Sequence, residues 1–474
     1  MNNGTAGSAA MNNRTSYTAA MNYRSAITKT TFVVSGMRYR LEKFTFLLLV
    51  AVFGLTTGAS CFADDWPQWR GASRDGVWKE TGLLEKFSSP QLPVKWRAPI
   101  GSGYSGPTVA NGRVYVTDRI TDPATNRPKE RVHCLDWANG KPLWTFSYDC
   151  EYSGVGYPDG PRAAVTVDRG LAFALGAKGH LHCLDASTGT RVWRHDLYKE
   201  YDIDLPIWGI AAAPIVDGEL TIVQIGGKGA CVVAFERTTG KERWRALSDR
   251  ASYCAPIIIS QAGKRVLVCR TGDRVVGLDP QSGKLYWEYP YPPKQMVIAI
   301  ATPVLQGDLL FLTCFYDGSA VLRLRQDKLA VEKVWQRCGQ NERNTDSLHS
   351  IISTPIILGE NIYGVDSYGE LRCLDLKTGD RIWESDKAVP RARWSTIHFV
   401  KNADKVWMIN ERGDLIIARL SPKGYEEISR AHLLEPTKGQ LSDRGGVCWS
   451  HPAFANKHIF ARNDNELVCA SLEK

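Results

Sequence analysis

Short apolar runs separated by turn residues dominate the chain, and residues 163–193 show the pattern most fully. The runs AAVTV, LAFAL, HLHCLD and TRVW follow one another, and each break between them contains a glycine. Runs of about five residues bounded by such turns are typical of strands joined by hairpins. The pattern predicts a four-stranded antiparallel sheet. A sheet this small needs neighbours to cover both of its faces.

The two ends of this segment recur along the chain. Its closing tryptophan returns at intervals of 43 to 51 residues: Trp144, Trp193, Trp244, Trp287, Trp335 and Trp383. The start of its first strand returns eight times as a small residue or histidine followed by proline or an aliphatic residue, at positions 107, 165, 214, 256, 303, 355, 397 and 452. A repeat of this length is typical of propellers and solenoids.

The two chain ends favour a closed ring. After Pro452 there is room for HIFARN and ELVCAS but not for a fourth strand. Residues 93–100, which carry Trp96, precede the first repeat and supply the missing strand. We therefore predict an all-β fold, an eight-bladed β-propeller over residues 93–474 whose last blade is closed by the N-terminal strand. The alternative, an open β-solenoid, leaves this half-blade without neighbours.

Residues 179–193 (GHLHCLDASTGTRVW) and 369–383 (GELRCLDLKTGDRIW) follow the pattern xLxCLDxxTGxxxW. They resemble the PQQ-repeat, or quinoprotein-like, β-propeller family, and the resemblance covers residues 94–474. It implies that Trp96 and the six repeat tryptophans dock against neighbouring blades. Two kinds of protein share this repeat: PQQ- and calcium-dependent alcohol or sugar dehydrogenases, and non-catalytic scaffolds such as the BamB-like lipoprotein of outer-membrane assembly. The fold alone does not separate them.

The front of the chain predicts export. Residues 1–36 are rich in Asn, Ser, Thr and Ala, which indicates a disordered extension or a start assigned too early. In residues 37–63 three basic residues precede a largely apolar run of 12, which predicts a secretory signal peptide too short to span a bilayer. We expect a periplasmic or secreted protein. Lipid anchoring at Cys61 is the alternative, although Gly58 stands where a lipobox has a large aliphatic residue.

Charge and cysteine content exclude several classes. Without residues 1–63 the formal net charge falls from +9 to +4, which is too small for a nucleic-acid or anionic-membrane binder. No CxxC or HExxH motif is present, and no metal site is predicted.

Eleven cysteines remain after residue 63. Those at one repeat position, including Cys183 and Cys373, are expected to be small buried residues. Cys150, Cys254, Cys338 and Cys448 lie in or beside connections, where they could pair.

The strand starts also locate a candidate site. The two residues before each start are nearly all small, which indicates close packing around a narrow axis. The third residue before each start is larger, and these eight are expected to ring the mouth of the channel: Tyr104, Arg162, Ala211, Tyr253, Ile300, Ile352, Trp394 and Trp449. We take as binding-rim candidates Tyr104, Arg162, Tyr253, Trp394, Trp449, His451 and Arg393, with His349 and Arg444 nearby. The alternative is half-buried packing at the mouth.

Long connections point to the same face. Binding usually occurs on long loops of this kind. The longest inter-blade loops are residues 148–162, 198–210, 338–352 and 436–448.

The lead-in, residues 64–92, is expected to be a clasp in which Trp66, Trp69 and Trp78 pack on the last blade. A loop over one propeller face is the alternative.

The chain lacks the adjacent cysteine pair of quinoprotein dehydrogenases, and their aspartate base and calcium ligands do not align with it. We therefore expect a monomeric, non-catalytic binding or scaffold module of the cell envelope, with no catalytic residues. A protein partner or small ligand would bind at the long-loop face. A dehydrogenase using PQQ and calcium is the alternative.

Overall fold

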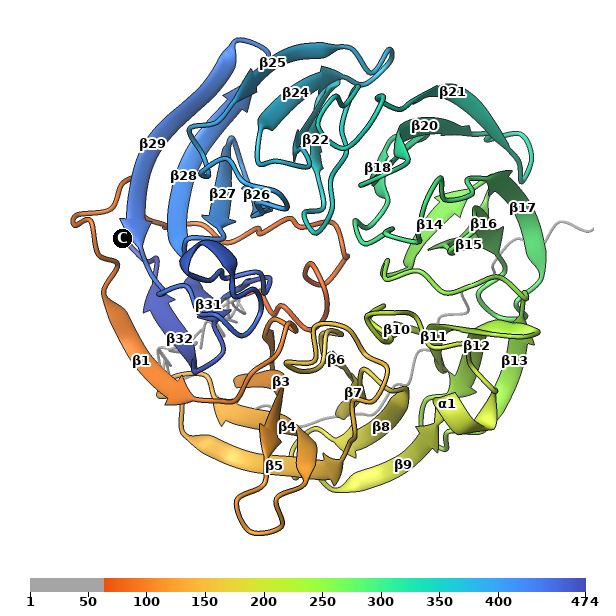
Figure 1. Ribbon diagram of the computed structural model, residues 1–474, viewed down its shortest axis with the longest axis vertical. Coiled ribbons are helices and arrows are strands. Elements are labelled where there is room, and N and C mark those ends of the chain that lie inside the picture. Colours follow the sequence, from red (N-terminus) through yellow and green to blue (C-terminus); the bar gives the residue numbers. More distant parts are fainter. Residues whose placement is uncertain (1–63) are drawn as a thin grey trace, which may run out of the picture. The chain divides into compact units, whose positions relative to one another are not determined.

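The computed structural model describes residues 64–474, so the predicted extension, the signal peptide and Cys61 lie outside the described residues. Within this range the chain forms eight four-stranded antiparallel sheets, arranged as the blades of a ring (Figure 1). The prediction of an eight-bladed all-β propeller is confirmed.

Seven blades run in chain order from their inner to their outer strand, and the eighth takes its outer strand, β1, from the start of the described chain. The first four are β2 (Thr108–Ala110), β3 (Arg113–Thr121), β4 (Pro128–Asp136) and β5 (Pro142–Asp149); β6 (Thr166–Asp168), β7 (Leu171–Leu175), β8 (His180–Asp185) and β9 (Arg191–Asp196); β10 (Ile215–Asp217), β11 (Leu220–Gly227), β12 (Ala230–Glu236) and β13 (Glu242–Ala246); β14 (Ile257–Gln261), β15 (Lys264–Arg270), β16 (Arg274–Leu278) and β17 (Leu285–Pro290). A single helical turn, α1 (Leu197–Glu200), follows β9.

The remaining four blades are β18 (Val304–Gln306), β19 (Leu309–Cys314), β20 (Gly318–Leu324) and β21 (Val331–Arg337); β22 (Ile356–Leu358), β23 (Asn361–Val365), β24 (Leu371–Asp375) and β25 (Arg381–Ser385); β26 (Ile397–Asn402), β27 (Lys405–Asn410), β28 (Asp414–Ser421) and β29 (Gly424–His432); and β30 (Ala453–Ala455), β31 (His458–Arg462), β32 (Glu466–Ser471) and β1 (Val94–Pro99). A short 3-10 turn spans Asp443–Gly445.

The N-terminal strand closes the ring. β1 pairs antiparallel with β32, the last strand of the chain, and Trp96 lies opposite Cys469. The sheet order β1-β32-β31-β30 therefore joins residues from both ends of the described chain in one blade. Closure removes the long unpaired edges that an open array would expose.

The cysteine of the repeat has a packing reason. In four blades the outer-strand tryptophan lies directly opposite a third-strand cysteine, as in the pairs Cys134–Trp144 and Cys469–Trp96. A small third-strand residue leaves room for the indole ring. At the equivalent position, Gly277 leaves no room for any side chain, because a Cβ atom there would lie 2.3 Å from the ring of Trp287.

Six of the seven repeat tryptophans link neighbouring blades. Their indole N–H groups donate to backbone carbonyls of the next blade at 2.8 to 3.2 Å: Trp96 to Trp137, Trp144 to Ala186, Trp193 to Arg237, Trp244 to Pro280, Trp335 to Leu376 and Trp383 to Ser421. Trp287 instead donates to Gln261 Oε1 of its own blade, and the Gln261 amide donates to Arg325 and Ala330 in the next one.

The lead-in, residues 64–92, bridges the point of closure. Trp66 exchanges backbone hydrogen bonds with Val109 of the first blade, and Trp78 N–H donates to Lys401 O of the seventh. The rings of Trp66 and Trp78 lie 6.1 and 5.0 Å from the ring of Phe454 in the last blade. Between these anchors the segment crosses the middle of the ring (orange in Figure 1), where Trp69 Nε1 donates to Thr302 Oγ1.

The cysteines form no disulfide within residues 64–474, so the suggested pairing of cysteines in the connections does not occur there. All eleven are free, and all except the half-buried Cys338 are buried. Burial raises the pKa of several of these thiols, Cys254 to about 12 among them, and keeps them protonated. Within the same range, no helix has the length and apolar character needed to cross a bilayer.

One buried histidine offers a stability test. His182 is 2% exposed between Phe146 and Tyr148, with ring centroids 5.0 and 4.4 Å away, and neither ring nitrogen has a described hydrogen-bond partner. Burial lowers its pKa to about 3. We expect His182→Phe to raise the free energy of unfolding at pH 7 by about 1–2 kcal/mol, because two unsatisfied polar atoms are removed. Urea unfolding measures this, and a variant less stable than the wild type would contradict it.

Candidate functional site

A cavity of about 160 Å³ lies where the chain enters the eight inner strands. All eight residues of the third position before the strand starts line it: Tyr104, Arg162, Ala211, Tyr253, Ile300, Ile352, Trp394 and Trp449. Ala164, Ala213, Ala255 and His451, from the small-residue positions, complete the inner part of the wall. Each blade contributes the residue at the same repeat position, so the eight side chains lie at a similar distance from the propeller axis.

Long inter-blade loops and the lead-in supply the remaining aromatic groups. Tyr157 comes from the loop between β5 and β6, Trp208 from the loop between β9 and β10, and Trp69 from the lead-in. Gly156 N–H donates to Ile207 O at 2.7 Å, which ties the first two loops together beside the cavity. Tyr157 and Trp208 were not among the residues predicted from the sequence to line the mouth, although they lie in two of the longest predicted loops.

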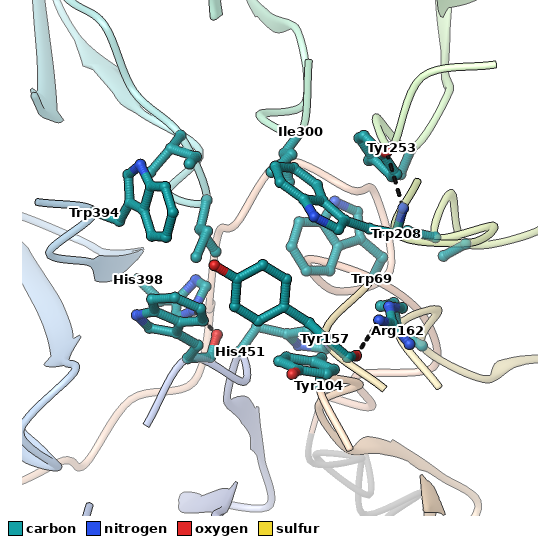
Figure 2. A pocket seen from close by; sticks show the side chains of 17 residues that line it. Trp69, Tyr104, Tyr157, Arg162, Trp208, Tyr253, Ile300, Trp394, His398 and His451 are labelled. Carbon is teal, nitrogen blue, oxygen red and sulfur yellow. Dashed lines mark hydrogen bonds between the residues drawn. The ribbon is translucent and has the colours of Figure 1, made fainter. Parts of the chain in front are cut away.

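Five of the aromatic side chains make a continuous series of ring contacts, with the Tyr157 ring in the middle of the view in Figure 2. Tyr157 lies 6.1 Å from Trp208 and 6.4 Å from Trp394, measured between ring centroids. Trp208 in turn lies 5.1 Å from Tyr253, and Trp394 lies 6.5 Å from Trp449. Such rings present both faces and edges, which favours apolar and aromatic groups.

Two histidines line the cavity beside Trp69. The Trp69 and His451 rings stack edge to face at 4.5 Å, and His398 Nε2 donates to Trp449 O at 2.8 Å. Burial lowers the pKa of His398 to about 4 and of His451 to about 3, and nearby positive charge on Arg70 acts in the same direction. Both imidazoles are therefore neutral at pH 7. His451 Nε2 has no hydrogen-bond partner among the described residues.

Arg162 is the one cation in the described lining. Its guanidinium donates to the carbonyls of Gly156 (2.8 Å), Tyr157 and Gly160, and it lies 4.9 Å from the centre of the Tyr104 ring. Arg162 thus holds the loop that carries Tyr157 in place. Most of its hydrogen-bonding capacity is already used.

Arg393 and Arg444 do not line the cavity but support its wall from behind. Arg393 pairs with Glu342 at 2.6 Å and lies over the Trp394 ring at 4.3 Å. Arg444 pairs with buried Glu411 at 2.9 Å, and Glu411 also accepts from Trp449 Nε1 at 3.1 Å. His349 is 1% exposed and bonds to Phe315 O, so it is a packing residue here.

The described residues do not fit PQQ with calcium. The lining contains no carboxylate and no cysteine. Within residues 64–474 no group of three His, Cys, Asp or Glu side chains is arranged to hold a metal ion. PQQ carries several carboxylates, and a buried anion needs cationic or hydrogen-bonding partners that Arg162 alone does not supply.

Fold and cavity together define the class: an eight-bladed propeller of tryptophan-docked repeats with an aromatic site on its axis. A family of PQQ-repeat proteins, described as outer membrane protein assembly factor BamB, matches residues 128–385, and the chain belongs to this family. BamB of Yersinia pestis is 22% identical over 272 residues, 55% of this chain and 64% of that protein. The quinohemoprotein alcohol dehydrogenase ADH-IIG of Pseudomonas putida is 28% identical over 216 residues, 42% of this chain and 30% of that protein.

Solved structures agree on the fold. BamB from Moraxella catarrhalis superimposes with a TM-score of 0.56 at 14% identity, covering 80% of this chain and 99% of that one. The quinohemoprotein alcohol dehydrogenase ADHIIG from Pseudomonas putida HK5 gives 0.62 at 12% identity, covering 86% and 80%. At these identities the likeness describes architecture, and the site must decide the function.

Proposed function

We propose that this chain is a non-catalytic binding or scaffold propeller of the cell envelope, exported by residues 37–63, that holds a partner at the aromatic cavity. The observation that carries the proposal is the lining itself: seven aromatic side chains, neutral histidines and no carboxylate. Such a surface binds apolar groups and has no carboxylate to remove a proton from an alcohol, and the imidazoles of His398 and His451, with pKa values of about 4 and about 3, are weak bases. Membership of the family described as BamB supports the same role.

Removing two cavity tryptophans tests this proposal. We expect Trp394→Ala combined with Trp449→Ala to weaken partner capture from cell-envelope extracts at least tenfold, because both rings form the wall of the site. Affinity purification with quantitative mass spectrometry measures the change. Trp137→Ala is the matched control, since Trp137 is half-buried beside His458 and away from the cavity. Undiminished capture by the double variant would remove the cavity from the proposal.

The dehydrogenase remains the second candidate because a quinohemoprotein alcohol dehydrogenase is among the relatives. It predicts a different result. Titrating the mature chain with PQQ and calcium would give a tight one-to-one complex with raised thermal stability, because a ligand that binds only the folded state stabilises it. We expect no such shift, and its appearance would overturn the proposed function.

A further inference from the structure

The outer strand of the first blade differs from the outer strands of the other blades. β5, with the sequence PLWTFSYD, has no charged side chain before its last residue, and its Leu143 is 48% exposed. The other seven outer strands, β1, β9, β13, β17, β21, β25 and β29, each have at least one charged side chain before the last residue. Charged side chains on an edge strand prevent another chain from pairing with it. β5 is therefore the least protected of these edges.

The outer edge of β5 can accept a further strand. β5 is the last strand in the sheet order β2-β3-β4-β5, and it lies on the outer rim of the ring (Figure 1). Cys150 N–H donates to Pro128 O, the first residue of β4, at 3.0 Å. Since the direction of the backbone groups alternates along an antiparallel pair, Thr145, Ser147 and Asp149 point their N–H and C=O groups away from β4. All three residues are exposed.

The two ends of β5 carry opposite charges. Lys141 directly precedes the strand and is exposed, and Asp149, whose side chain is 55% exposed, ends it. The ion pairs of Asp149 within residues 64–474 are long, 3.5 Å to Arg127 and 4.0 Å to Lys129. Two antiparallel copies of β5 bring Lys141 of each copy beside Asp149 of the other, whereas parallel copies would bring like charges together. The charges therefore favour a second copy of this chain, in the antiparallel direction.

The same register matches the side chains between the two ends. A two-fold axis at Thr145 places this residue opposite Thr145 of the second copy, and Leu143 opposite Ser147 of the second copy. On the other face of the sheet, Trp144 comes to lie opposite Phe146 of the second copy. Threonine pairs and aromatic pairs that lie directly opposite each other stabilise antiparallel strands.

We propose that two copies of this chain pair through antiparallel β5 strands about a two-fold axis at Thr145, which joins their first blades into one eight-stranded sheet. Pro142 lies outside the paired residues 143–147, so its missing N–H group does not interrupt the hydrogen bonds. Such a dimer differs from the monomer expected from the sequence. It is independent of the proposed function, because no residue of β5 belongs to the described lining of the cavity.

A charge at the two-fold axis tests the dimer. Sedimentation velocity of the mature chain over a range of concentrations should show a monomer–dimer equilibrium. Thr145→Lys should raise its dissociation constant about tenfold or more, because two lysines would face each other across the axis. Gln336→Lys is the matched control and should change nothing, since Gln336 is exposed and follows Trp335 as Thr145 follows Trp144. A wild type that stays monomeric at every concentration, or a dimer that Thr145→Lys leaves unchanged, would overturn the proposal.

Reversing the charges at the two ends of β5 tests the register without altering the axis. Lys141→Glu and Asp149→Lys should each weaken the dimer severalfold, because each change brings like charges together. The combined variant should recover the wild-type dissociation constant, since opposite charges again face each other. A combined variant no tighter than either single variant would overturn the proposal. Partner capture through Trp394 and Trp449 should be the same in all these variants, so a failure of the dimer leaves the proposed function standing.

Discussion

Gly106→Ala is expected to lower the free energy of unfolding by about 3 kcal/mol or more. A Cβ atom at Gly106 would lie 1.9 Å from the carbonyl oxygen of His451 and 2.6 Å from its Nδ1. The carbonyl belongs to the residue pair that leads into β30, so relief requires moving the first blade away from the last. Overpacking at a rigid backbone contact costs more than a rotamer change can relieve. Urea unfolding followed by circular dichroism measures the loss.

Gly359→Ala is the matched control for this experiment. Gly359 has φ +62°, and no described atom lies within 4 Å of the position of its added Cβ. Alanine there meets only left-handed backbone strain, which costs about 1 kcal/mol. A loss at Gly106 no larger than the loss at Gly359 would show that the first and last blades are not closely packed at the axis.

The repeat register explains why much of the fold and part of the cavity could be predicted. The small residues before each strand start indicated a crowded axis, and Gly106 shows the cause. The residues one position earlier, such as Tyr104 and Trp449, all line one cavity because equivalent positions of the eight blades lie at a similar distance from the axis. Whether this lining binds a partner stays a proposal.

The parts of the cavity that could not be predicted from the sequence depend on loops that do not follow the repeat pattern. Tyr157 enters the cavity from a loop with left-handed φ of 52°, held by Arg162, and no repeat position encodes that path. Arg393 adjoins the lining residue Trp394, but its guanidinium turns away to Glu342, 51 residues earlier in the chain. Such long-range ion pairs depend on loop conformations that a local pattern does not specify.

Stability is expected to fall as the pH drops below about 6.5, and His398 and His451 account for a large share of the loss. Their folded-state pKa values, about 4 and about 3, lie below the ordinary value of 6.5 because both rings are buried. Between these values the unfolded chain binds protons that the folded chain cannot, so acid favours unfolding. Each histidine therefore lowers the free energy of unfolding by about 1.4 kcal/mol for every pH unit below 6.5, which amounts to about 2 kcal/mol at pH 5.

The combined variant His398→Gln with His451→Leu isolates this contribution. Its free energy of unfolding should decline less steeply than that of the wild type between pH 7 and pH 5, by about 4 kcal/mol in total, as measured by urea unfolding at each pH. Above pH 7 the two proteins should show parallel curves, because these histidines are neutral in both states. If the free energies of unfolding of the two proteins declined equally steeply below pH 6.5, His398 and His451 would have to accept protons as readily in the folded state as in the unfolded state.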